Sequence, residues 1–167
     1  NMDFRGVASD GSQTSNTASR NLVYTVNNGQ ISGTTGKGLR LESLKLNLKD
    51  QSCSGTIQYK THVQNLGWQN MVSDGQISGT TGRALRVEAI NISLTGEMAR
   101  KYDVYYRVHV QNYGWLSWAK NGENAGTEGL GLRMESMQIL LVKKGENKPS
   151  NTYNGVVSNY SSAYYKK

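Results

Sequence analysis

One block of sequence occurs three times and restricts the fold more than any other feature. The copies begin at residues 29, 75 and 122, so the repeat has a period of 46 and then 47 residues. They read GQISGTTGKGLRLESLKLNL, GQISGTTGRALRVEAINISL and GENAGTEGLGLRMESMQILL. Repeats of this length are typical of folds that build one core from similar supersecondary units. We therefore expect three related units that pack on each other.

The second half of each block predicts a bent β-strand. In the second copy, Leu85 and Val87 alternate with polar residues, but the apolar positions then shift to Ile90 and Ile92. Such a shift turns the strand over unless one extra residue is inserted. We predict a β-bulge at this point. The small residue at the shift is Ser43, Ala89 or Ser136 in the three copies.

The segments between the blocks are also typical of strands and tight turns. Residues 57–64 and 104–111 alternate between apolar and polar side chains, and no segment has a convincing helical period. We predict an all-β fold with pseudo-threefold symmetry, as a β-prism or a β-trefoil. The prism is favoured because each unit supplies a hairpin and a long strand.

The domain is expected to cover residues 1–142, with units at about 3–48, 57–94 and 104–142 and a loop over 9–19. Residues 143–167 read as a polar, basic tail whose end either pairs as an edge strand or stays mobile. The formal net charge is +7, and four of these charges lie in the tail, which has five lysines and one glutamate. An anionic surface is therefore an expected partner of the tail. The remaining +3 is too weak a charge to indicate nucleic acid.

No residue pattern indicates catalysis, a cofactor or a metal. Cys53 is the only cysteine, and the two histidines, His62 and His109, have no ligand-like neighbours in sequence. The glycine-rich residues 79–82 precede a strand rather than a helix, so a tight turn is favoured over a phosphate site. No apolar run is long enough to span a membrane. These observations indicate a non-catalytic protein.

The recurring Arg-x-Glu pairs favour a structural role. Arg86 and Glu88, like their counterparts, are two residues apart and share one face of a strand. We expect each arginine to bridge to the glutamate of a neighbouring unit or to loop carbonyls.

Aromatic and polar residues around the turns are the best candidates for ligand contacts. Trp68 and Trp115 recur at one position, which favours the core, whereas Trp118 has Met71 and Thr25 as counterparts and suits a surface role. The predicted ligand-binding residues are Gln64, Asn65, Trp68, Asp74, His109, Gln111, Asn112, Tyr113, Trp115 and Trp118.

The motif HVQN-x-GW at 62–68 and 109–115, followed by G-x-x-x-GTxG and L-R-x-E, resembles the clostridial hydrophobic repeat with conserved Trp, ChW. The resemblance implies a secreted or surface protein of a Gram-positive bacterium. It also implies lectin-like binding to polysaccharide, cell-wall polymer or glycoprotein; the alternative is a protein-binding adhesin or toxin-like subunit. The first unit departs from the motif, with Leu22 in place of Trp, so its site is expected to be altered or absent.

Overall fold

A computed structural model describes the backbone of residues 2–9, 22–27 and 29–167, with side chains from residue 29 onward. The loop expected over 9–19 lies outside the described residues, except for Ser9 at the end of the first strand.

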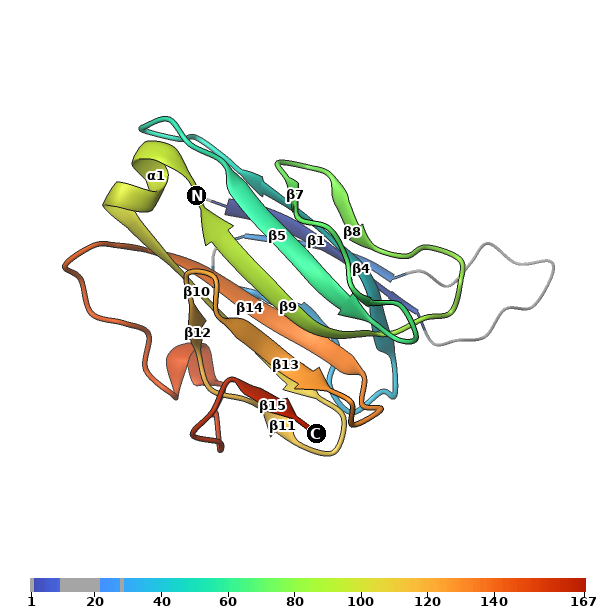
Figure 1. Ribbon diagram of the computed structural model, residues 1–167. Helices are drawn as coiled ribbons and strands as arrows, with labels where there is room; N and C mark the ends of the chain where they lie inside the picture. Colours follow the sequence, from blue (N-terminus) through green and yellow to red (C-terminus); the bar gives the residue numbers. More distant parts are fainter. Residues whose placement is uncertain (1, 10–21, 28) are drawn as a thin grey trace.

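Three long antiparallel strand pairs form the framework, one in each unit (Figure 1). The first pair is β1 (Met2–Ser9) with β4 (Arg40–Leu48). The second is β5 (Ile57–Val63) with β9 (Val87–Leu94), and the third is β10 (Tyr102–Val110) with β14 (Met134–Lys143). Each pair lies in its own sheet. The all-β fold with three repeats is confirmed, while the choice between prism and trefoil stays a prediction.

Short strands extend each pair on one side. In the first unit β2 (Leu22–Asn27) pairs with β1. In the second, β6 (Gly67–Trp68) and β7 (Val72–Ser73) pair with β5. In the third, β11 (Gly114–Trp115) and β12 (Ala119–Lys120) pair with β10. The strands β6 and β11 begin at the end of the turns predicted at residues 65–67 and 112–114.

Each unit also gives one strand to the sheet of another unit. The strand β3 (Ile31–Gly33) pairs with β14 of the third unit, and β8 (Ile77–Gly79) pairs with β4 of the first. The strand β13 (Asn124–Glu128) pairs with β9 of the second. The exchange runs in a circle through all three units. It carries the loop after each donated strand onto the end of a neighbour's long pair.

The predicted bulge is present in every long pair. The registers pair Ser43 with Val7 and Leu41 with Ala8, so Glu42 is the extra residue. The same shift occurs between His62 and Val63 and between His109 and Val110, which leaves Glu88 and Glu135 as the extra residues. The bulge therefore lies at the glutamate and the small residue that follows it.

The donated strands approach these bulges closely, which explains the invariant second glycine of the block. A Cβ on Gly79 would lie 2.6 Å from Ser43 Cα and closer still to the Glu42 carbonyl oxygen. Gly33 and Gly126 meet the bulges of the third and second units in the same way. Only glycine fits such a contact.

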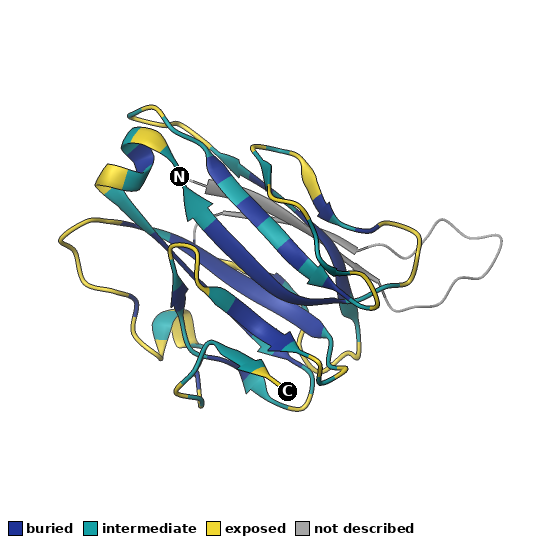
Figure 2. Ribbon diagram, in the orientation of Figure 1, coloured by how far each residue is buried: buried dark blue, intermediate teal, exposed yellow. Residues whose placement is uncertain are grey.

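The core lies between the three sheets. Along β5, Ile57, Tyr59, Thr61 and Val63 are buried and the intervening residues are half-buried, as the alternation predicted (Figure 2). The largest fully buried apolar side chains include Leu41, Leu44, Leu46, Ile90, Ile92, Tyr106 and Leu116.

The C-terminal segment packs onto the repeats. The strand β15 (Tyr164–Lys166) pairs parallel with β13, which agrees with the edge-strand alternative. Two short helical elements, α1 (Gly96–Lys101) and the 3-10 turn η1 (Tyr153–Gly155), lack the periodicity that sequence analysis needs to predict a helix. In the part of the chain that the structure describes, no helix is long and apolar enough to cross a membrane.

Candidate functional site

The bulge turns its glutamate toward the arginine two residues earlier. Arg86 Nε lies 2.9 Å from Glu88 Oε2, and Arg133 Nη2 lies 3.3 Å from Glu135 Oε2. Arg40 Nη2 lies 2.8 Å from Glu42 Oε1 in the first unit. The glutamates are almost completely buried. The Arg-x-Glu pairs are thus ion pairs within one unit, and the expected bridge to a neighbouring unit's glutamate is wrong because the bulge brings the pair's own side chains together.

A histidine completes the cluster in the second and third units. The register puts His62 opposite Ala89 and His109 opposite Ser136, next to the bulged glutamates. His62 Nδ1 lies 3.1 Å from Glu88 Oε1, and His109 Nδ1 lies 3.3 Å from Glu135 Oε1. Sequence analysis missed this pairing because the partners are far apart in the chain. The available signal was that both histidines and both glutamates recur at one spacing.

The tryptophan that recurs in the second and third units packs against this histidine. The rings of His62 and Trp68 meet edge to face with centroids 5.5 Å apart, as do those of His109 and Trp115. In the first unit the register puts Val7 at the histidine position. The Arg–Glu–His–Trp cluster therefore exists in two units, as the departure of the first unit from the motif implied.

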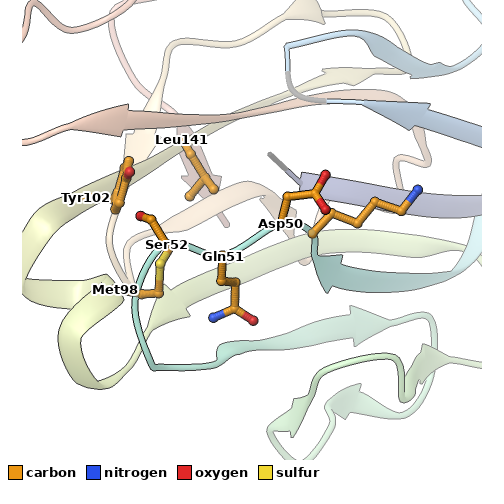
Figure 3. Close-up of a pocket in the computed structure, with 7 residues that line it drawn as sticks. Asp50, Gln51, Ser52, Met98, Tyr102 and Leu141 are labelled. Atoms are coloured by element: carbon orange, nitrogen blue, oxygen red, sulfur yellow. The ribbon is translucent and has the colours of Figure 1, made fainter.

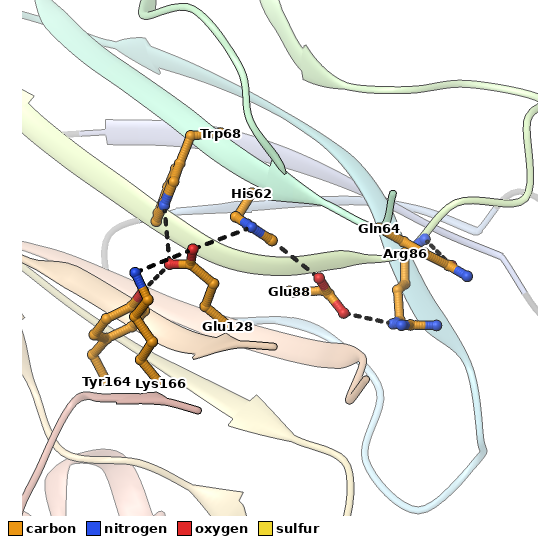
Figure 4. A network of polar contacts seen from close by, with 8 residues as sticks. All are labelled: His62, Gln64, Trp68, Arg86, Glu88, Glu128, Tyr164 and Lys166. Atoms are coloured by element: carbon orange, nitrogen blue, oxygen red, sulfur yellow. Dashed lines mark hydrogen bonds and ion pairs between the residues drawn. The ribbon is translucent and has the colours of Figure 1, made fainter. Parts of the chain in front are cut away.

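The cluster of the second unit is covered by Glu128 and β15 (Figure 4). Glu128 accepts a hydrogen bond of 3.3 Å from Trp68 Nε1 and another from the Tyr164 hydroxyl. Its carboxylate also lies 3.7 Å from His62 Nε2 and 3.6 Å from Lys166 Nζ. The second site is thus filled by groups of the chain itself.

These contacts shift the acidity of both hydrogen-bonding partners. The hydrogen bond from Tyr164 lowers the pKa of Glu128 most, and Trp68 and the charge of Lys166 lower it further. Burial raises the pKa of Tyr164, and the carboxylate of Glu128 raises it further. Glu128 is therefore ionised at neutral pH and Tyr164 keeps its proton.

The cluster of the third unit opens into a shallow groove of about 560 Å³. One wall comes from the turn after β10 and the other from the loop after β3, which belongs to the first unit. The lining residues are Thr35, Gly36, Gly38, His109, Gln111, Asn112, Tyr113, Gly114, Arg133 and Glu135. Four of the predicted residues, His109, Gln111, Asn112 and Tyr113, thus come together on this groove.

The surroundings of His109 keep its imidazole neutral near pH 7. Burial lowers the pKa of His109, and the neighbouring Glu135 carboxylate raises it by less than burial lowers it. In the tautomer with hydrogen on Nδ1, that nitrogen lies 3.3 Å from Glu135 Oε1 and Nε2 keeps a lone pair. His109 can then accept a hydrogen bond from a ligand, or donate one after taking up a proton.

The amides of the predicted set stabilise the turns. Gln64 Oε1 accepts a hydrogen bond of 3.3 Å from Arg86 N, and Gln111 Oε1 accepts one of 3.4 Å from Arg133 N. Asn65 and Asn112 occupy the left-handed turn positions with φ of 65° and 67°. Their side chains are exposed, and only Asn112 borders the open groove.

Two predicted residues lie away from both clusters. Asp74 Oδ1 accepts a hydrogen bond of 3.0 Å from Ile57 N, so it fixes the start of β5. Trp118 Nε1 donates a hydrogen bond of 3.0 Å to the Ser150 carbonyl, and its ring packs on Tyr153 and lies 4.5 Å from the Arg107 guanidinium. These contacts give Trp118 a structural role in holding the C-terminal segment.

Among the described residues, no group of three or more His, Cys, Asp or Glu side chains is placed to hold a metal ion.

Comparison with protein families gives one match. A family model described as Clostridial hydrophobic W matches residues 24–50, 62–96 and 109–143, which together make up more than half of the chain. No curated protein and no solved structure matches the chain.

Proposed function

Because the chain belongs to the Clostridial hydrophobic W family, whose repeats occur in extracellular proteins, we propose that it is a secreted or cell-surface, non-catalytic module that binds glycans through the third-unit groove. The groove between the β10 turn and the β3 loop is the observation that carries this proposal.

The composition of the groove suits a sugar better than an apolar ligand. Tyr113 offers an aromatic ring, while Gln111, Asn112 and Thr35 offer amides and a hydroxyl that can both donate and accept hydrogen bonds. The Arg133–Glu135 ion pair adds a fixed donor and acceptor at the floor. An open groove that combines one ring with polar groups of fixed orientation matches the alternating apolar and hydroxyl faces of a pyranose.

An array of cell-wall and host glycans, probed with the whole chain, tests the proposal. The variant N112G removes a groove side chain, and glycine accepts the φ of 67° without strain. The matched control is N65G, at φ 65° in the second unit, whose cluster is covered. We expect N112G to weaken glycan binding several-fold and N65G to leave it unchanged. Equal loss in both variants, or no glycan bound by the parent chain, contradicts the proposal.

A second candidate function, binding to an anionic surface, is favoured by a basic groove at another end of the β10–β14 pair. A depression of about 480 Å³ is lined by Arg100, Lys101, Lys143 and Lys144, together with Ser52 and Tyr102. Of these cations, Lys144 is bound to Asp103 at 2.7 Å. Ser52 and Tyr102 also border a smaller pocket, which is lined by Lys49, Asp50 and Gln51 as well (Figure 3).

The cations of this groove include the first two lysines of the segment that sequence analysis identified as a basic tail. We propose that the groove strengthens attachment to phosphate-rich wall polymer. A K101E/K143E variant is expected to lose binding to isolated anionic wall polymer at low salt and to keep binding to neutral glycans. Binding of the parent that is unchanged between 50 and 500 mM salt, roughly a threefold change in Debye length, contradicts this candidate.

A further inference from the structure

The three donated strands, each taken with the loop that follows it, differ at one position. Thr35, Thr81 and Glu128 are the equivalent residues, each two positions after the glycine that contacts a bulge. Two positions further on, the residues are Lys37, Arg83 and Leu130. Glu128, the last residue of β13, covers the second cluster. The loop with Thr35 borders the third cluster, and β8 carries the loop with Thr81 to the first unit.

In the second unit, Glu128 acts as an internal ligand. Its carboxylate contacts His62 Nε2 and Trp68 Nε1 of the cluster, and it accepts a hydrogen bond from the hydroxyl of Tyr164 in β15. Lys166 balances its charge. The second cluster is therefore a carboxylate-binding site that the chain has filled itself.

The third unit has the same cluster without an internal carboxylate. The His109–Trp115 and His62–Trp68 ring pairs have the same 5.5 Å separation and interplanar angles of 77° and 78°. Thr35 is shorter than glutamate, uncharged and exposed, and no described residue forms a hydrogen bond or ion pair with His109 Nε2. In the same loop, the cation Lys37 replaces Leu130.

We propose that the third-unit groove binds a carboxylate group of an acidic glycan at the place that corresponds to the Glu128 carboxylate in the second unit. The inference rests on the proposed glycan-binding function and names the class of sugar. A sugar carboxylate can accept a hydrogen bond from protonated His109, while the sugar ring lies along Tyr113 and Asn112. The exposed Lys37, between the lining residues Gly36 and Gly38, adds positive charge to the same loop.

Carboxylate binding at this place is linked to protonation of His109. The charged groups on the elements around the imidazole are Glu135 on β14, Arg133 just before β14, and Arg107 on β10, the strand of His109. The loop after β3 adds Lys37, which is exposed and lies between the lining residues Gly36 and Gly38. A bound carboxylate raises the pKa of His109, so the ligand takes up a proton with it. Affinity for an acidic sugar should then rise as the pH falls from 8 to 5.5, by at most about tenfold per pH unit. A neutral sugar that donates a hydroxyl hydrogen to His109 Nε2 needs the neutral imidazole, so its affinity should fall as the pH falls.

Exchange of the loop residues tests the inference on the whole chain. T35E gives the third site the internal carboxylate of the second, and E128T removes that carboxylate from the second site. T81E is the matched control, because the same change faces the first unit, where Val7 stands at the histidine position. The probes are oligosaccharides of galacturonic acid, glucuronic acid and muramic acid, each with its neutral parent sugar or methyl ester.

We expect the acidic probes to bind at least tenfold more tightly than their neutral partners, with one site per chain. T35E should remove this preference, T81E should leave it unchanged, and E128T should add a second site. Thermal melting shows whether E128T folds. If it does not fold, the loss of acidic preference in T35E tests the carboxylate assignment by itself.

Two results would separate this inference from the proposed function. Equal binding of acidic and neutral probes, or acidic binding unaffected by T35E, overturns the carboxylate assignment and leaves glycan binding intact. Binding of no glycan of either kind overturns both.

Discussion

At the scale of single residues, the bulged glutamate and the glycine that touches it define the repeat. Glu42, Glu88 and Glu135 are extra residues in their strands, so their side chains turn aside to meet the arginine of the same unit. The backbone around each bulge leaves room only for a glycine of another unit. The bulged glutamate and the glycine that touches its backbone therefore connect three features: the Arg–Glu ion pair, the bend in the strand and the contact between units.

The glycine contact predicts a large loss of stability on substitution. In G79A the new Cβ would meet the backbone of Glu42 and Ser43 at a φ of 105°. The cost should exceed about 3 kcal/mol of unfolding free energy, because backbone displacement adds to the strain of a left-handed alanine. G82A is the control, since its φ is 68° and its Cβ meets nothing within 4 Å, so about 1 kcal/mol is expected. Urea denaturation measures both; equal losses would refute the close contact.

Arg107, like Trp118, holds the C-terminal segment to the third unit. Its completely buried guanidinium donates to Gln138 Oε1 at 2.7 Å, to Ser158 Oγ at 2.7 Å and to the carbonyls of Asn151, Tyr153 and Val156 at 3.0–3.1 Å. Burial lowers the pKa of Arg107 to about 10, so it stays protonated at neutral pH.

R107M should therefore release the segment around residues 150–158. Loss of the cation leaves several acceptors without a donor, which should cost about 3 kcal/mol or more. The control is K60M, at the equivalent position of the second unit, where the half-buried Lys60 only places its Nζ 5.2 Å from the Trp68 ring; about 1 kcal/mol is expected there. Limited proteolysis at 150–158 that is no faster in R107M than in K60M would contradict this role.

At the scale of elements, β15 and the end of β13 cover the second cluster and leave the third one open. The strand β15 is short and lies at a sheet edge, so we expect its side-chain contacts with Glu128 to stabilise its attachment more than its backbone pairing does. Because the pKa of Glu128 is lowered in the folded chain, its contribution to stability is fully present above the unfolded pKa of about 4.3 and is lost as the pH falls through the folded pKa.

Acidification should accordingly detach β15 before the repeats unfold. Between pH 5 and pH 3, hydrogen-exchange protection of the Lys167 amide, which donates to the Glu128 carbonyl at 3.0 Å, should fall after correction for the intrinsic rate. E128Q should show low protection throughout and no such step. A step of equal size in E128Q would assign the pH dependence to another group.

Element positions were largely predictable from the sequence, but their partners were not. The alternation of apolar and polar residues predicted the long strands, and the shift of the apolar positions predicted the bulges, because both depend on which face of the strand is apolar. The exchange of β3, β8 and β13 leaves no trace in alternation, since a strand of three residues can pair with any free edge. For the same reason the His109–Glu135 pair, which joins two strands, was not foreseen, nor were the contacts of Trp118, a predicted ligand-binding residue, with Tyr153 and Arg107.

At the scale of the whole molecule, approximate threefold repetition provides three similar places that the chain uses differently. The first lacks the histidine, the second is filled by Glu128, and the third is open beside Thr35. The circular exchange of strands explains why the differences arise between units, because each cluster is bordered by the loop of another unit. Changes in one loop can thus open or close a neighbouring site without altering the scaffold.

The number and place of bound ligands test the central claim most directly. The claim is that only the third-unit groove is available for a glycan. Titration of the chain with the best array ligand, followed by NMR shifts of the histidine and tryptophan side chains, measures both quantities. We predict one ligand per chain, with shifts at His109 and Trp115 and none at His62 and Trp68. Two or three equal sites, or shifts centred on His62, would contradict the account.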